Sequence, residues 1–121
     1  MATKKTLVLG ASTNPSRYSF LAIQKLTKKG HEIIAIGSRI GKVDNVEIVS
    51  ERSEIDNLDT VTLYLNATNQ KQYYDYIISQ HPNRIIFNPG AENEELKALA
   101  EAKGILTQEA CTLVLLSTGQ Y

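Results

Sequence analysis

The stretch that most constrains the fold is a short apolar run that leads through a glycine into a helix start. Thr6–Leu9 is typical of a buried strand, and Gly10 follows where a tight turn needs a residue without a side chain. Asn14 offers a capping oxygen, and Pro15 suits the first helical position because its missing N–H would have had no intrahelical partner. A helix that begins directly above a strand end turns free N–H groups and its positive dipole end toward the loop, which favours a phosphate there. Arg17 adds a fixed positive charge at the same place.

Strand and helix signals then alternate along the chain. After the first strand, further strands are expected at His31–Ile36, Val46–Val49, Val61–Leu65, Arg84–Phe87 and Ile105–Thr107. Helices are expected from Pro15 to Lys29, from Asn69 to a stop at Pro82, from Asn93 to Gly104 and within Ala110–Gln120. Residues 37–58 are the least regular part, with room for one helical turn at Glu51–Asn57. A strand, a helix and a strand within about thirty residues form the unit of parallel sheets. The sequence therefore predicts one Rossmann-like, doubly wound α/β domain over residues 1–121, with a mostly parallel sheet of about five strands and helices on both faces.

Composition narrows the partners and the compartment. With 121 residues, 42% of them hydrophobic, the chain can build one complete core but not two ordinary ones. The 13 basic and 13 acidic side chains cancel, so no net field attracts nucleic acid or an anionic membrane surface. Cys111 is the single cysteine, which excludes an internal disulfide, and no apolar run has the length of a signal peptide core or a membrane span. We expect a cytoplasmic protein with a small-molecule ligand.

Ligands of doubly wound sheets bind beyond the carboxyl ends of the strands, which places four segments on one rim. These segments are Gly10–Arg17, Gly37–Lys42, Asn66–Asn69 and Asn88–Glu92. A dinucleotide fingerprint would require three glycines after the first strand and an acid after the second, and the chain has neither. Ser38, Arg39 and Lys42 stand where that acid would be. Cations at this point favour a ligand with an extra phosphate on its adenosine ribose, as in a phosphorylated dinucleotide or coenzyme A (CoA).

Several motifs together resemble the small stand-alone CoA-binding proteins. They are Gly10–Ser12 followed by Pro15–Ser19, then Lys29–Ile33, Phe87–Asn93, Cys111–Leu113 and Thr118–Gln120, so that the resemblance covers nearly the whole chain. The fold of those proteins is similar to the CoA-binding domain at the N-terminus of the succinyl-CoA ligase alpha subunit. The chain departs from their pattern where a proline usually follows the second strand, because Gly37-Ser38-Arg39 stands there instead.

The resemblance implies CoA as the ligand and gives each rim segment a role. Gly10–Ser12 with Arg17 would hold the diphosphate, Ser38, Arg39 and Lys42 would lie near the phosphorylated adenosine, and Asn66–Thr68 would line the path of the adenine or pantetheine. The residues expected to bind the ligand are Gly10, Ala11, Ser12, Asn14, Arg17, Tyr18, Ser19, Ser38, Arg39, Lys42, Asn66, Ala67, Thr68, Asn88, Pro89 and Gly90.

Three hypotheses for the function follow. The first is a module that holds CoA or an acyl derivative without catalysis, because no nucleophile and base pair is evident and no metal site is expected. His31 and His81 are about fifty positions apart and form no ligand or base constellation by spacing. The second is a small enzyme, either an NADP-linked reductase or an acyl-CoA hydrolase or transferase that uses Glu92 or Cys111. In the third, the rim binds a partner protein and the domain is half of a homodimer.

Overall fold

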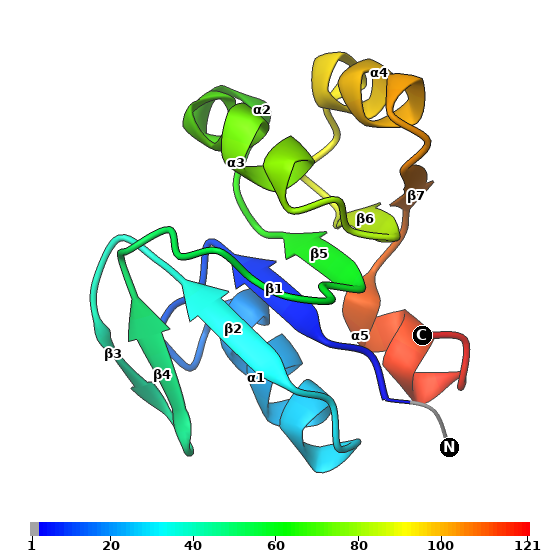
Figure 1. Cartoon of the computed structure of the whole chain (residues 1–121). Coiled ribbons are helices and arrows are strands. Elements are labelled where there is room, and N and C mark those ends of the chain that lie inside the picture. The colour runs from blue at the N-terminus through cyan, green and yellow to red at the C-terminus, as the bar shows by residue number, and fades with distance from the viewer. Residues whose placement is uncertain (1–2) are drawn as a thin grey trace.

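Parallel strand pairs dominate the sheet in the computed structural model, which describes residues 3–121 (Figure 1). The strands are β1 (Thr6–Leu9), β2 (Ile33–Ile36), β3 (Gly41–Val43), β4 (Val46–Val49), β5 (Thr60–Leu63), β6 (Arg84–Phe87) and β7 (Leu106–Glu109). The helices are α1 (Tyr18–Lys28), α2 (Ala67–Gln70), the 3₁₀ turn η1 (Lys71–Tyr73), α3 (Tyr74–Ser79), α4 (Glu94–Ala102) and α5 (Thr112–Ser117). The α/β class expected from the sequence is confirmed.

The strand order is β3-β4-β2-β1-β5-β6-β7, and every neighbouring pair is parallel except β3 and β4. Without β3, this is the 3-2-1-4-5-6 order of doubly wound folds. The sheet has seven strands rather than about five. The additional edge strand arises because β3 folds back on β4 through a tight turn at Asp44, whose φ is 53°, and sets Lys42 opposite Glu47.

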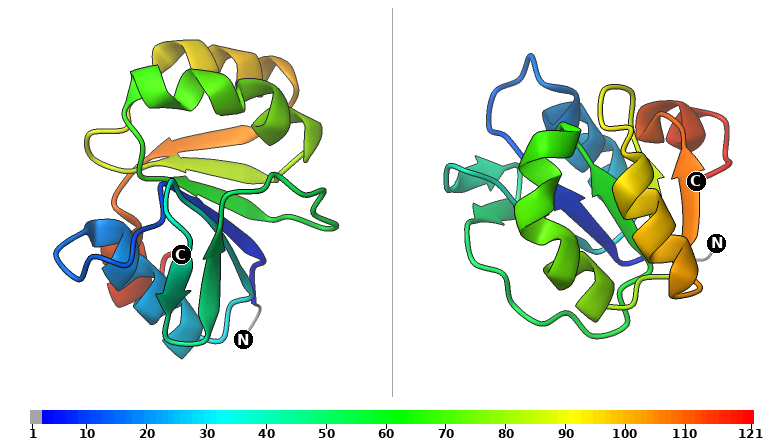
Figure 2. Two further views of the ribbon diagram at one scale, coloured as in Figure 1. Left: turned by 90° about the vertical axis from the view of Figure 1, so that its left-hand side faces the viewer. Right: turned by 90° about the horizontal axis from the view of Figure 1, so that it is seen from above.

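Helices cover both faces of the sheet, with α1 and α5 on one side and α2, α3 and α4 on the other (Figure 2). Alternate residues of β1 pack on opposite faces of the sheet. Leu7 and Leu9 belong to the core cluster beneath α3 and α4, whereas Val8 belongs to the cluster beneath α1 and α5. The central strands are therefore buried on both faces, as parallel strands between two helical layers must be. No helix within residues 3–121 has the length and apolar character needed to cross a membrane.

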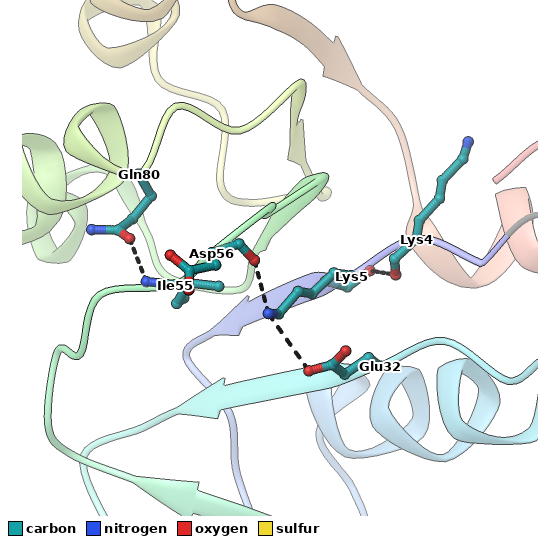
Figure 3. A network of polar contacts seen from close by, with 7 residues as sticks. Lys4, Lys5, Glu32, Ile55, Asp56 and Gln80 are labelled. Atoms are coloured by element: carbon teal, nitrogen blue, oxygen red, sulfur yellow. Dashed lines mark hydrogen bonds and ion pairs between the residues drawn. The ribbon is translucent and has the colours of Figure 1, made fainter.

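The segment between β4 and β5 has no helical turn, so the expectation for Glu51–Asn57 is wrong. It forms no regular element apart from a turn at residues 56–57, and it is held by side chains of other elements. Lys5 Nζ donates to Asp56 O at 2.8 Å and pairs with Glu32 Oε2 at 3.7 Å, while the Ile55 N–H donates to Gln80 Oε1 at 2.7 Å (Figure 3). These long-range partners replace the local hydrogen bonds that a helical turn would supply.

The first residues of α2 and α4 are determined by capping side chains. Asn93 caps α4 as expected, because its Oδ1 accepts from the N–H groups of Glu95 and Leu96. The helix expected from Asn69 begins instead at Ala67, since Asn66 Oδ1 accepts from the Asn69 N–H at 2.9 Å. The expected helix in the tail is confirmed as α5.

The surroundings of His31, which precedes β2, lead us to expect a loss of stability in acid. Its Nδ1 accepts the Lys4 N–H at 2.9 Å, and its ring meets that of Tyr121 edge-on. Burial, followed by the nearby charges of Lys4 and Arg84, lowers the pKa of His31 below 6.5, and Asp59 opposes this only in part. The unfolded chain then binds more protons than the folded one. Stability is therefore complete above about pH 6.5 and falls as the pH drops through the lowered pKa.

Urea unfolding measured from pH 7.5 to 5 should show this decline. His31→Asn keeps an acceptor near the Lys4 amide but cannot titrate, so its decline should be shallower than that of the wild type. Parallel curves for the two proteins would exclude His31 as the titrating group.

Candidate functional site

The carboxyl ends of β1 and β5 form the point where the chain changes direction between the two helical layers. From β1 the chain passes to α1 on one face, and from β5 it passes to α2 on the other (Figure 1). A crevice is expected at such a point of a doubly wound sheet. Gly10 follows β1 with a φ of +87°, and a Cβ there would lie 2.9 Å from the backbone carbon and oxygen of Tyr64. Only glycine meets both conditions, as the sequence predicted.

The loop after Gly10 differs in detail from the expectation. The N–H groups of Gly10 and Ala11 both donate to Ile36 O at 3.0 Å, so they tie the loop to β2 instead of facing a ligand. The expected start of α1 at Pro15 with an Asn14 cap is wrong. Asn14 Oδ1 accepts instead from the backbone N–H and the hydroxyl of Ser16, which closes a local turn.

As a result, α1 begins at Tyr18 with Arg17 in the N-cap position and no side-chain cap. The first-turn N–H groups of this 11-residue helix are not taken by a capping side chain, and they carry the positive end of its dipole. Ser19 of the same turn is buried, whereas Arg17 and Tyr18 are exposed. This helix end can therefore receive an anion, with the Arg17 guanidinium beside it.

Two cavities meet at this helix end. One, of about 300 Å³, lies between the start of α1 and the loops that follow β5 and β6, and is lined by Ser16, Arg17, Tyr18, Ser19, Tyr64, Leu65, Asn66, Pro89, Gly90 and Ala91. The other, of about 480 Å³, lies over the ends of β1 and β2 and is lined by Ala11, Ser12, Thr13, Asn14, Arg17, Ser38, Arg39 and Leu65. We call them the β5–β6 cavity and the β1–β2 cavity. They share Arg17 and Leu65, and both volumes are in the range of small-molecule sites.

The charged residues that line the two cavities are Arg17 and Arg39. No carboxylate faces either cavity, and the ion pair found within residues 3–121 joins Lys5 to Glu32 elsewhere. Both guanidiniums are therefore free of acidic partners in the described part of the chain. The crevice is suited to a ligand with more than one negative charge.

The structure brings most of the predicted binding residues to these cavities. Ala11, Ser12, Asn14, Arg17, Ser38 and Arg39 line the β1–β2 cavity, and Arg17, Tyr18, Ser19, Asn66, Pro89 and Gly90 line the β5–β6 cavity. Ala67 and Thr68 form the first turn of α2 and line neither cavity. Lys42 lies in β3 and borders a separate depression against β4, whereas Arg39 lines the β1–β2 cavity.

Asn88 lies beneath the site rather than in it. Its Nδ2 donates to Thr62 Oγ1 at 2.7 Å and to Leu63 O at 2.8 Å, and its Oδ1 accepts the Thr112 N–H at 2.8 Å. These bonds use both N–H groups and the oxygen of the amide inside the core, where Asn88 is buried. Asn88 therefore fixes the end of β6, from which the Pro89–Gly90 loop enters the cavity wall.

Five lining residues are absent from the predicted binding residues: Thr13, Ser16 and Ala91, which lie within the predicted rim segments, and Tyr64 and Leu65, which do not. Tyr64 and Leu65 were assigned to a strand that in fact ends at Leu63, so the loop begins two residues earlier than expected. Burial raises the pKa of Tyr64, and its hydroxyl is enclosed without a hydrogen-bond partner in the described residues. The wall that Tyr64 provides is thus uncharged at neutral pH.

The residues considered for catalysis lie outside the cavity linings. Glu92 is exposed and its Oε1 accepts the Gly90 N–H at 2.9 Å, which shapes the loop after β6. Cys111 is half-buried at the N-cap of α5. Among residues 3–121, no three of the His, Cys, Asp and Glu side chains are grouped as a metal ion requires.

The strand order defines a Rossmann-like α/β domain, and the crevice at its switch point carries two arginines that suit an anionic ligand. The chain belongs to the CoA binding domain family, which matches residues 4–117. The resemblance to small stand-alone CoA-binding proteins is thereby confirmed.

Several solved structures share this fold. A crystal structure of an uncharacterized protein is 48% identical over 100% of both chains, with a TM-score of 0.97. A hypothetical protein from Pyrococcus horikoshii OT3 has a TM-score of 0.86 at 19% identity, over 96% of this chain and 83% of its own. A Thermus thermophilus structure reaches 0.86 at 17% identity, over 98% and 91% of the two chains, and these two distant likenesses concern the fold alone. None of the curated proteins matches this chain.

Proposed function

We propose that this chain binds CoA or an acyl-CoA across the two cavities and acts as a binding module without catalysing a reaction. The observation that carries the proposal is the junction at Arg17, where an uncapped helix end and two cavities without acidic residues meet. Membership of the CoA binding domain family supports the same ligand. The positions of Glu92 and Cys111 outside the linings favour binding over thioester chemistry.

The shape of the crevice suggests how such a ligand would lie. The diphosphate would sit at the start of α1 beside Arg17, because Arg17 lines both cavities and the positive end of the helix dipole lies there. The phosphorylated adenosine would occupy the β1–β2 cavity near Ser38 and Arg39. The pantetheine arm, which is largely uncharged, would then run into the β5–β6 cavity along Tyr64 and the Pro89–Gly90 loop.

A comparison of CoA with dephospho-CoA tests the adenosine end. The two ligands differ only in the ribose phosphate, and a charge-assisted hydrogen bond contributes about 1.5–3 kcal/mol, so CoA should bind at least about tenfold more tightly. Calorimetric titration at one fixed salt concentration measures both affinities. NADP, which carries its extra phosphate at another ribose position, serves as a third ligand and should bind more weakly than CoA.

A pair of variants locates the phosphate. Arg39→Gln should bring the two affinities within about twofold of each other, because the residue that faces the β1–β2 cavity loses its charge. Lys42→Gln is the matched control, since Lys42 borders a different depression and should leave the preference for CoA intact. Equal binding of CoA and dephospho-CoA by the wild type, or binding of neither, would contradict the proposal. Turnover of an acyl-CoA that is lost in Glu92→Gln would contradict its non-catalytic part.

A further inference from the structure

One buried side chain joins the two loops that face each other across the β5–β6 cavity. Gln70 closes α2 and is fully buried. Its Nε2 donates to Leu65 O at 2.7 Å and to Ala91 O at 2.7 Å. Leu65 belongs to the loop after β5 and Ala91 to the loop after β6, and both residues line the cavity. A single amide group therefore bridges the two loops at a fixed distance.

The orientation of this amide is determined by a second one. Gln70 Oε1 accepts from Asn93 Nδ2 at 2.9 Å, and Asn93 Nδ2 also donates to the Tyr74 hydroxyl at 2.8 Å. Asn93 Oδ1 is occupied by the cap of α4. If the Gln70 amide turned over, its oxygen would face two carbonyl oxygens and its N–H₂ group would face that of Asn93. Every donor and acceptor of the pair is therefore used in one arrangement only.

We propose that Gln70 is a positioning residue, which sets the separation of the Leu65 and Ala91 loops and thereby the affinity for the ligand arm between them. This inference rests on the proposed function, in which that arm is pantetheine. The β1–β2 cavity is built mainly from residues that follow β1 and β2, and it shares only Leu65 with the bridge. Gln70 should thus influence one part of the ligand and leave the nucleotide part nearly unaffected.

Two ligands separate the two parts. CoA fills both cavities, whereas adenosine 3′,5′-bisphosphate has the phosphorylated adenosine but no pantetheine arm. Gln70→Met keeps a side chain of similar length and removes the bridge, so the loops lose their common donor. We expect about a tenfold loss of affinity for CoA and less than about a twofold change for the bisphosphate. Both affinities are measured by calorimetric titration.

Gln80 supplies a matched control on the same helical layer. Its amide also bridges two segments, because Oε1 accepts the Ile55 N–H at 2.7 Å (Figure 3), but Gln80 lines neither cavity. Gln80→Met should lower the stability of the fold and leave the ratio of the two affinities unchanged. A Gln70→Met protein that loses affinity for both ligands equally, or for neither, overturns the inference. A wild type that binds neither ligand overturns the proposed function instead, and the inference with it.

Gln70→Glu provides a test that depends on ionisation and covers the case in which the methionine variant does not fold. The ionised carboxylate would face the two carbonyl oxygens, whereas the protonated acid could donate to one of them. The affinity of Gln70→Glu for CoA, relative to that of the wild type at each pH, should therefore rise as the pH falls from 8 to 5. A ratio that does not change with pH overturns the inference.

Discussion

Replacing Arg17 by alanine should weaken CoA binding by about 10- to 100-fold, the affinity equivalent of the 1.5–3 kcal/mol that a charge-assisted hydrogen bond contributes. The loss should be large because Arg17 lines both cavities and stands at the N-cap of α1, where the diphosphate would be held. The side chain is exposed and makes no ion pair within residues 3–121, so its removal should barely change the free energy of unfolding. Calorimetric titration with CoA and a urea unfolding curve measure the two quantities separately.

Arg17→Lys and Lys29→Ala complete this experiment. Lysine retains the charge but not the planar fork of donors, so its affinity for CoA should fall between those of the wild type and of the alanine variant. Lys29 caps the opposite end of α1, and its replacement should leave affinity within about twofold. An Arg17→Ala protein that binds CoA as well as the wild type would place the diphosphate elsewhere in the crevice.

The sheet could be predicted because its determinants are local in sequence. Thr6–Leu9 and Arg84–Phe87 are short apolar runs bounded by turn residues, and both are nearly completely buried between two helical layers. The glycine after the first strand and the Asn93 cap also depend on one residue and its immediate neighbours. Where the conformation of a residue depends only on neighbours within a few positions of the chain, the sequence alone predicts the structure.

Elements that depend on competition or on distant partners could not be predicted. Asn14 can cap a helix or close a turn with the residue two positions on, and in this fold it closes the turn with Ser16. β3 has three residues and a partner strand across one tight turn, which leaves too few positions for a period to be recognised. The segment around Ile55 forms no helical turn, and the Ile55 N–H donates instead to Gln80 Oε1, which is distant in the chain.

The residues on the rim of the candidate site could be predicted from the sequence, but the buried residue that holds its loops together could not. Arg17 and Arg39 follow strand ends, and the topology of a doubly wound sheet alone brings such residues together. Gln70 looks like any glutamine on a helix, yet it is fully buried and bridges loops that are separated in the chain. The hydrophobic periodicity of a sequence cannot identify such a residue, because its hydrogen-bond partners are backbone carbonyl groups of other segments.

The largest expected effect on stability belongs to Gly37→Ala. A Cβ at Gly37 would lie 2.2 Å from Ala11 O and 3.1 Å from Ile48 Cγ2, and the first of these contacts is far inside the limit for any real Cβ. The backbone cannot yield easily, because the Gly37 N–H donates to Val49 O and the Ala11 N–H donates to Ile36 O, each at 3.0 Å. Relief therefore requires the loop after β1 to separate from β2, at a cost of about 3 kcal/mol in the free energy of unfolding.

The same displacement should weaken CoA binding, since Ala11 and the residues after it line the β1–β2 cavity. Gly104→Ala is the control that separates crowding from backbone strain. Gly104 has a φ of +77° with no atom within 4 Å of an added Cβ, so alanine there meets only the left-handed conformation, which costs about 1–2 kcal/mol. Urea unfolding of both variants, with CoA titration of each, decides the matter. If Gly37→Ala were no less stable than Gly104→Ala and bound CoA normally, the loop would not depend on its contact with β2. The close approach of Gly37 to Ala11 would then have no part in shaping the site.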